Sequence, residues 1–290
     1  MYQAIADAIR QHLEQSLGSI DVQPLAGGSI NQVMRITLDN QTQYVLKTQS
    51  GRVAENTFQI EFDSLALLSA ANAVRVPQAL VAGDDFLVME YILPGPRSAD
   101  WEETLGRQLA MQHLNTRRDD YGFPCDNFIG TTVQINDWQS SWLQFWREQR
   151  LGSQLRRYAE QTGRDSLVEK GERLMSALED LLGAVQEPAV LLHGDLWSGN
   201  AMADQLGQPV LFDPACYYGH REAEFGMMRL FGGFGPRCEA AYQEIWPFAE
   251  GFENRFRLYQ LYHELNHLNL FGRAYYSASM ASIEALLRTV

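Results

Sequence analysis

The chain has 290 residues, 46% of them hydrophobic, which is enough to bury one large core or two modest ones. Its 36 acidic and 23 basic residues give a net charge of −13, which argues against nonspecific nucleic-acid binding because that binding needs a basic surface. The three cysteines form no CxxC pair, so neither a disulfide framework nor a thiolate zinc site is indicated.

The N-terminal residues Met1–Asp7 lack the basic region and apolar core of a signal peptide. No apolar run approaches the roughly 20 residues that a helix needs to cross a bilayer. The sequence therefore predicts a cytoplasmic protein that does not interact with membranes, and it does not indicate an oligomeric state.

The first ninety residues are predicted to be mostly strands. Apolar residues at four-residue steps predict a helix over 1–17, and a second helix is expected over 55–71. Short alternating or apolar runs predict strands over 21–25, 32–38, 43–48, 78–82 and 86–91, with a hairpin turn at 38–41.

The pattern changes after Leu93-Pro94-Gly95-Pro96, a break in regular structure that indicates a boundary. Helices are predicted over 100–116, 137–160, 165–185, 237–249 and 254–288, with short strands at 189–193 and 209–212. This order predicts an α+β, protein-kinase-like fold with a small β-rich N-lobe, residues 1–92, and a larger, mainly helical C-lobe, residues 93–290.

The strongest chemical signal is the run His193-Gly194-Asp195-Leu196-Trp197-Ser198-Gly199-Asn200, followed thirteen positions later by Asp213. Asp195 can accept the proton of a substrate hydroxyl, while oxygens of Asn200 and Asp213 can hold magnesium against ATP phosphates. A short hairpin between them is expected to return Asp213 to the loop. His193 is interpreted as a structural residue that braces this loop.

A glycine turn between two predicted strands adds to this signal. It contains Gly27, Gly28, Ser29 and Asn31, whose backbone and side-chain groups can approach phosphates closely. Taken alone, the same turn is also typical of an ordinary hairpin.

Lys47 lies on a predicted strand, and Glu61 follows fourteen residues later on the next helix. A strand lysine and a helix glutamate form the ion pair that positions α- and β-phosphates in kinases, with Glu55 as the alternative partner. Met89, Glu90 and Tyr91 end the following strand and are predicted to offer backbone groups to adenine.

His263-Glu264-Leu265-Asn266-His267 matches the H-E-x-x-H pattern of zinc peptidases on a predicted helix. The 23 residues after His267 contain no histidine to serve as a third ligand. Helix packing is the preferred interpretation of both histidines, with His267 placed on the substrate side.

Several segments together resemble the fructosamine kinase (ketosamine-3-kinase) family, within the aminoglycoside-phosphotransferase-like group. They are residues 27–31, Tyr121–Gly130, His193–Asn200, Asp213-Pro214-Ala215, Tyr218–Glu222, Phe231–Phe234, Tyr262–His267 and Phe271-Gly272. They occur in order over nearly the whole chain.

The resemblance implies ATP- and Mg²⁺-dependent phosphorylation of a sugar hydroxyl on a small-molecule or protein-bound ketoamine, in the fructosamine or ribulosamine 3-kinase manner, and a role in deglycation. It also implies the roles given above for Asp195, Asn200, Asp213 and Lys47. On the substrate side, Trp197 is expected to form an aromatic wall. Glu222 and Glu224 are expected to face the ketoamine nitrogen, with capping or pairing on a helix as the alternative.

Two other functions stay open at this point. A related kinase could act on choline, homoserine, an aminoglycoside or another amino alcohol, because the catalytic residues would be the same. A zinc peptidase built on His263, Glu264 and His267 is the more distant alternative.

Overall fold

The computed structural model describes residues 5, 7–9, 11, 20–25, 32–49, 56–183 and 186–290. The chain divides into two compact units, Met1–Ser98 with Met202–Pro214, and Ala99–Ala201 with Ala215–Val290. The lobe boundary between residues 92 and 93 stays a prediction, and the second segment of the first unit was not foreseen.

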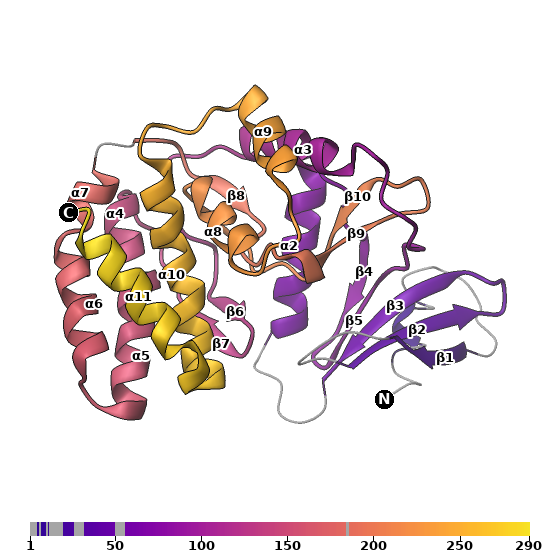
Figure 1. Ribbon diagram of the computed structural model, residues 1–290. Helices are drawn as coiled ribbons and strands as arrows, with labels where there is room; N and C mark the ends of the chain where they lie inside the picture. Colours follow the sequence, from indigo (N-terminus) through magenta and orange to yellow (C-terminus); the bar gives the residue numbers. More distant parts are fainter. Residues whose placement is uncertain are drawn as a thin grey trace. The chain divides into compact units, whose positions relative to one another are not determined.

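The first unit contains a five-stranded antiparallel sheet in the order β1-β2-β3-β5-β4 (Figure 1). Its strands are β1 (Ile20–Pro24), β2 (Gln32–Leu38), β3 (Gln43–Thr48), β4 (Ala79–Ala82) and β5 (Phe86–Glu90). All five lie where the alternating and apolar runs predict them. Of the helix predicted over 1–17, the described residues 5, 7–9 and 11 are helical.

Apolar side chains cover one face of this sheet. Ile5 and Ile9 pack with Leu46 and Val88, which lie opposite each other in β3 and β5. Successive side chains of a strand point to opposite faces, so Lys47 lies on the other face from Leu46.

Helix α2 (Thr57–Ala70) packs against β4 and β5 through a side that buries Phe58, Leu65 and Leu68. The prediction of a helix over 55–71 is confirmed for the residues described. The helix ends at Ala71, and Asn72 follows in the left-handed conformation with a φ of 51°.

A two-stranded hairpin of β9 (Ala201–Ala203) and β10 (Pro209–Leu211) precedes Asp213. Among the described residues, three backbone hydrogen bonds join it to the Met1–Ser98 segment of the first unit. They run from Gly95 N–H to the Ala203 carbonyl and from Leu211 N–H to the Arg75 carbonyl, both at 2.9 Å, and from Ser98 N–H to the Gly207 carbonyl at 3.2 Å. The Arg75 side chain also joins the hairpin to β5, because it forms ion pairs with Asp204 in the hairpin turn and with Glu90 at the end of β5.

The second unit is mainly helical. Its elements are α3 (Trp101–Asn115), β6 (Asn127–Ile129), β7 (Thr132–Gln134), α4 (Trp142–Phe145), a π-helical segment (Trp146–Leu151), α5 (Gly152–Thr162), α6 (Ser166–Ser176), α7 (Leu178–Leu182), β8 (Val190–Leu192), a 3₁₀ turn (Ser198–Asn200), β11 (Tyr217–Gly219), α8 (Glu222–Leu230), α9 (Pro236–Ile245), α10 (Phe252–Phe271), a second 3₁₀ turn (Arg273–Tyr275) and α11 (Tyr276–Leu287). Figure 1 shows α10 and α11 beside α5 and α6, and α3 packs against α9. No described helix is both long and apolar enough to cross a membrane.

The prediction of one helix over 254–288 is wrong. Gly272 adopts a φ of 80°, which ends α10, and the chain makes a 3₁₀ turn before α11 begins. The helix predicted to begin at residue 137 begins instead at Trp142, where Ser141 caps it by accepting a hydrogen bond from Gln144 N–H. The β6–β7 hairpin and α8 were not predicted.

Candidate active site

In the first unit, Lys47 is the centre of a buried charge cluster. Its ammonium lies 2.5 Å from a carboxylate oxygen of Glu61 in α2 and also contacts Asp213, which follows β10. The predicted pair of Lys47 with Glu61 is therefore present, while the alternative partner, Glu55, lies outside the described residues. Only 5% of the Lys47 surface is exposed.

Two opposing effects act on the Lys47 ammonium. Burial lowers its pKa, but the charges of Glu61 and Asp213 outweigh burial and raise the pKa above its ordinary value. Lys47 therefore stays cationic at any physiological pH. Such a fixed cation on the face of a sheet is suited to bind phosphate oxygens.

Asp213 has an unusual backbone conformation. Its φ is 59°, in the left-handed region, which costs a residue other than glycine about 1–2 kcal/mol. The conformation accompanies the contact with Lys47, and 37% of the Asp213 side chain is exposed. Part of this carboxylate is therefore accessible from solvent.

The other nucleotide residues predicted in the first unit are only partly described. Gly27, Gly28, Ser29 and Asn31 lie outside the described residues. At the end of β5, Met89 is buried, and Glu90 and Tyr91 are half-buried. The Glu90 N–H donates to Gln78 at 2.8 Å, so the predicted contact with adenine would rely on other backbone groups there.

In the second unit, Asp195 and Asn200 lie in the loop after β8. The Asn200 amide nitrogen donates to the Asp195 backbone oxygen at 2.9 Å and to its carboxylate at 3.2 Å. The Asn200 N–H also binds the Trp197 carbonyl. These bonds fix the Asp195 carboxylate in a half-buried position and use the nitrogen end of the Asn200 amide.

Glu224 anchors the start of this loop from α8. One of its carboxylate oxygens accepts the His193 N–H at 2.6 Å, and the other accepts the Gly194 N–H at 3.1 Å. Gly194 has a φ of 81°, and an added Cβ would lie 2.1 Å from the Ala215 carbonyl, so the loop requires glycine here. The bracing role expected of His193 agrees with its imidazole, whose Nδ1 accepts the Asp195 N–H at 3.4 Å.

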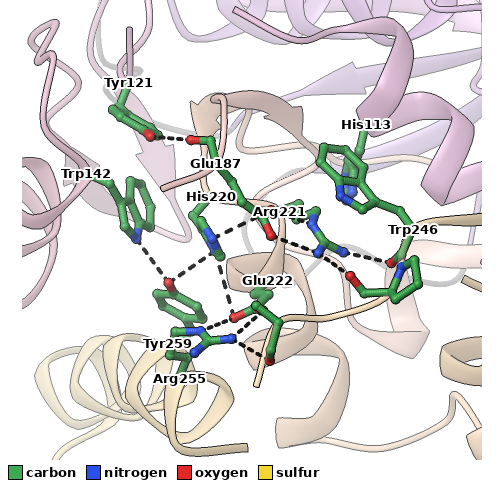
Figure 2. A network of polar contacts seen from close by, with 12 residues as sticks. His113, Tyr121, Trp142, Glu187, His220, Arg221, Glu222, Trp246, Arg255 and Tyr259 are labelled. Carbon is green, nitrogen blue, oxygen red and sulfur yellow. Dashed lines mark hydrogen bonds and ion pairs between the residues drawn. The ribbon is translucent and has the colours of Figure 1, made fainter. Parts of the chain in front are cut away.

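Glu222 is also engaged within the protein. Its carboxylate forms two hydrogen bonds with Arg255 of α10, at 2.6 and 2.8 Å, and the side chain is fully buried (Figure 2). With both oxygens of Glu222 and of Glu224 bound internally, contact with the ketoamine nitrogen is not supported for either residue. Glu222 follows the alternative prediction, since it forms an ion pair with a helix residue. Glu224 instead accepts hydrogen bonds from two backbone N–H groups.

A network of polar contacts surrounds the start of α8. Arg221 binds Glu187 through two hydrogen bonds of 2.5 and 2.9 Å, and it also binds the carbonyls of Trp246 and Pro247. Figure 2 shows Arg221 between Glu187 and Trp246. His220 lies beside them, and burial lowers its pKa to about 4, so it is neutral at physiological pH. These contacts fix the helix that carries Glu224.

An aromatic row adjoins the Asp195 loop. The Trp197 ring, 37% exposed, packs edge-on against Phe231, which in turn contacts His267 at 5.0 Å between ring centroids. The His267 Nδ1 lies 2.7 Å from the His263 carbonyl, which can only accept, so Nδ1 carries the proton and Nε2 is an acceptor in the neutral ring. Trp197 and His267 are thus linked through Phe231.

The residues of the H-E-x-x-H pattern lie in α10. His263 is buried, and burial lowers its pKa to about 3; Glu264 is also buried and accepts a hydrogen bond from Gln260. Among the described residues there is no group of three His, Cys, Asp or Glu side chains that could hold a metal ion. His263 packs edge-on against Tyr262 and His267 against Phe231, contacts that agree with the packing role preferred from the sequence.

Comparisons with known proteins agree with this architecture. A family model described as "Fructosamine kinase" matches residues 1–289. The chloroplastic protein-ribulosamine 3-kinase of Oryza sativa subsp. japonica is 43% identical over 274 residues, covering 92% of this chain and 79% of the relative. A solved structure from Thermobifida fusca, assigned as a fructosamine-3-kinase, is 30% identical with a TM-score of 0.88, covering 98% of this chain and 99% of that one.

The fold extends to more distant proteins. The crystal structure of an aminoglycoside phosphotransferase matches with a TM-score of 0.65 at 15% identity and covers 100% of this chain and 99% of that one. At this identity the likeness concerns the fold alone, and it confirms the predicted kinase-like α+β class.

Proposed function

The chain belongs to the fructosamine kinase family and is a phosphotransferase, and from this premise we propose which of its residues perform the reaction. The enzyme transfers the γ-phosphoryl group of ATP to a sugar hydroxyl of a ketoamine. The chloroplastic relative named as a protein-ribulosamine 3-kinase supports this acceptor class, and removal of glycation adducts is the role we propose for the reaction.

Asp195 is proposed as the proton acceptor. During transfer, the substrate oxygen forms a bond to the γ-phosphorus, the bond from that phosphorus to the bridging oxygen of ADP breaks, and the hydroxyl proton passes to the Asp195 carboxylate. The observation that carries this role is the pair of hydrogen bonds from Asn200, which orient the carboxylate in a half-buried loop. Orientation of this kind supplies much of the catalysis in phosphoryl transfer.

Asn200 and Asp213 are proposed to bind Mg²⁺. Their amide and carboxylate oxygens are the hard ligands that this ion prefers, and the Asn200 nitrogen is already bonded to Asp195, which assigns its oxygen to the cation. When bound, Mg²⁺ neutralises charge on the phosphates. Lys47, held cationic by Glu61, is proposed to bind the phosphates themselves.

Trp197 and His267 are proposed to contact the sugar-bearing substrate. Trp197 offers a partly exposed ring in the Asp195 loop. His267, whose ring packs against Phe231, offers its Nε2 as a hydrogen-bond acceptor. Flat apolar rings with a few polar groups are typical of sites that bind small polar molecules.

The decisive variant is Asp195→Asn. We expect kcat for ADP release with a fructosamine or ribulosamine substrate to fall by about 10²–10⁴-fold, because the proton acceptor is lost. Asp180→Asn, an exposed position on α7, is the matched control and should leave kcat unchanged. Turnover of another amino alcohol but of no ketoamine would refute the acceptor class, and an active Asp195→Asn enzyme would refute the role of this residue.

A further inference from the structure

A polar cavity lies on the second unit beside the β6–β7 hairpin. Its volume is about 310 Å³, and it is lined by Thr132 and Val133 of β7 and, among others, by Ser153, Arg156 and Arg157 of α5. None of these residues belongs to the proposed catalytic or magnesium-binding set.

The two adjacent arginines are the cationic groups of the cavity lining. Among the described residues, neither Arg156 nor Arg157 is ion-paired with a carboxylate, and Arg156 donates only to the backbone oxygen of Glu148. Seven other arginines bind carboxylates: Arg75, Arg107, Arg164, Arg221, Arg229, Arg237 and Arg255. In a chain with 36 acidic residues, adjacent guanidinium groups without carboxylate partners are suited to bind an anion from outside.

The walls of the cavity provide further polar groups. Thr132 is 2% exposed, and its hydroxyl has no hydrogen-bond partner among the described residues. Gln154 of α5 also lines the cavity and is fixed by hydrogen bonds to Asn266 and Asn269 of α10. The one acidic side chain on the lining, Glu160, is exposed.

The cavity is built on the strand that also contacts the catalytic loop. Gln134, two residues after Thr132 in β7, donates to the Ala215 carbonyl at 3.2 Å, and the Ala215 N–H binds the His193 carbonyl. A short hairpin therefore connects the cavity wall with the start of the Asp195 loop.

Tyr262 of α10 is a second link. It donates to Gln134 at 2.9 Å. Burial is the main cause of its raised pKa, and the charges of both Asp195 and Arg157 also act on this hydroxyl. Tyr262 is therefore hydrogen-bonded to the same β7 residue that contacts Ala215 beside the catalytic loop.

We propose that this cavity binds the anionic group of an acidic ketoamine, namely a carboxylate on its amine component. Arg157, with Arg156, would bind the carboxylate through the planar guanidinium fork, so that adducts of amino acids or peptides are preferred over adducts of neutral amines. The inference rests on the proposed ketoamine kinase activity, because it names the class of acceptor that this activity would prefer.

The test compares three ketoamine substrates in the complete protein. They are fructose adducts of propylamine and of β-alanine, and a propylamine adduct of a sugar phosphate, each assayed by ADP release and by calorimetric binding without ATP. Arg157→Gln should raise KM and Kd for the β-alanine adduct about tenfold or more and leave those for the propylamine adduct unchanged. Arg157→Lys should recover part of the loss, and Arg164→Gln, an exposed arginine paired with Glu172, is the matched control.

The outcomes separate this inference from the proposed function. Binding of the β-alanine adduct that requires Arg157 supports the cavity even if no substrate is phosphorylated. An equal effect of Arg157→Gln on the neutral and the carboxylate adduct, or no effect on either, would overturn the proposal. Arg157 dependence confined to the sugar phosphate would overturn the assignment to a carboxylate on the amine.

Discussion

At the scale of single residues, the proposed proton acceptor depends on a glutamate whose carboxylate is bound inside the protein. Glu224 holds the His193 and Gly194 amides, one with each carboxylate oxygen, two and one residues before Asp195. Because both amides are donors, the site requires two acceptor oxygens at once. Glu224 is therefore a positioning residue for the catalytic loop.

Glu224→Gln tests this role. The amide nitrogen of glutamine would face one of the two N–H donors, so we expect the loop to shift and kcat to fall by about tenfold to a hundredfold. KM for ATP should change little, which distinguishes loss of positioning from loss of nucleotide binding. Glu253→Gln, whose side chain is 65% exposed, is the control, and an unaltered kcat in a folded Glu224→Gln enzyme would contradict the assignment.

At the scale of elements, a buried ion pair joins α8 to α10, in addition to the more exposed pair of Arg229 with Glu253. Glu222 and Arg255 share two hydrogen bonds, and their side chains are 0% and 4% exposed. Removal of one partner leaves the other charge buried without compensation, whereas removal of both replaces the pair with apolar packing.

We expect Arg255→Met to lower the free energy of unfolding by about 3–5 kcal/mol, measured by urea denaturation. The double variant Arg255→Met/Glu222→Leu should recover most of that loss. A double variant as unstable as the single one would show that Arg255 acts through its bonds to backbone carbonyls instead of through Glu222.

The sequence predicts those features that depend on local pattern and spacing. The alternating runs locate all five strands of the large sheet, and the interval between Lys47 and Glu61 predicts their ion pair. The sequence near α8 does not indicate where the side chains of Glu222 and Glu224 point. Their directions depend on Arg255 and on the backbone after β8, and both are distant in sequence. The contact of Lys47 with Asp213 is equally nonlocal, and it accompanies a left-handed residue that no pattern indicates.

At the scale of the whole molecule, buried histidines make stability depend on pH. Burial lowers the pKa of His220 to about 4 and that of His263 to about 3, whereas both should titrate near about 6.5 in the unfolded chain. Between these values the unfolded state binds more protons, so stability decreases as pH falls below about 6.5.

Each of these histidines should contribute about 1.2 kcal/mol to the change in unfolding free energy between pH 6 and pH 5. Replacement of His220 or His263 by Gln should reduce that change by one such contribution, measured by urea denaturation at several pH values. A variant with the same change as the unaltered protein would show that the histidine is not neutral in the folded state.

The charge cluster at Lys47 has a consequence for how ligands bind. One ammonium meets two carboxylates, so the ionised group carries one net negative charge and Lys47 is shared between Glu61 and Asp213. Under the proposed roles, a cation that binds the Asp213 carboxylate weakens the ion pair between Asp213 and Lys47. The Lys47 ammonium then becomes more available to phosphates. Metal and nucleotide affinities should therefore be thermodynamically linked, each ligand strengthening the other by the same factor.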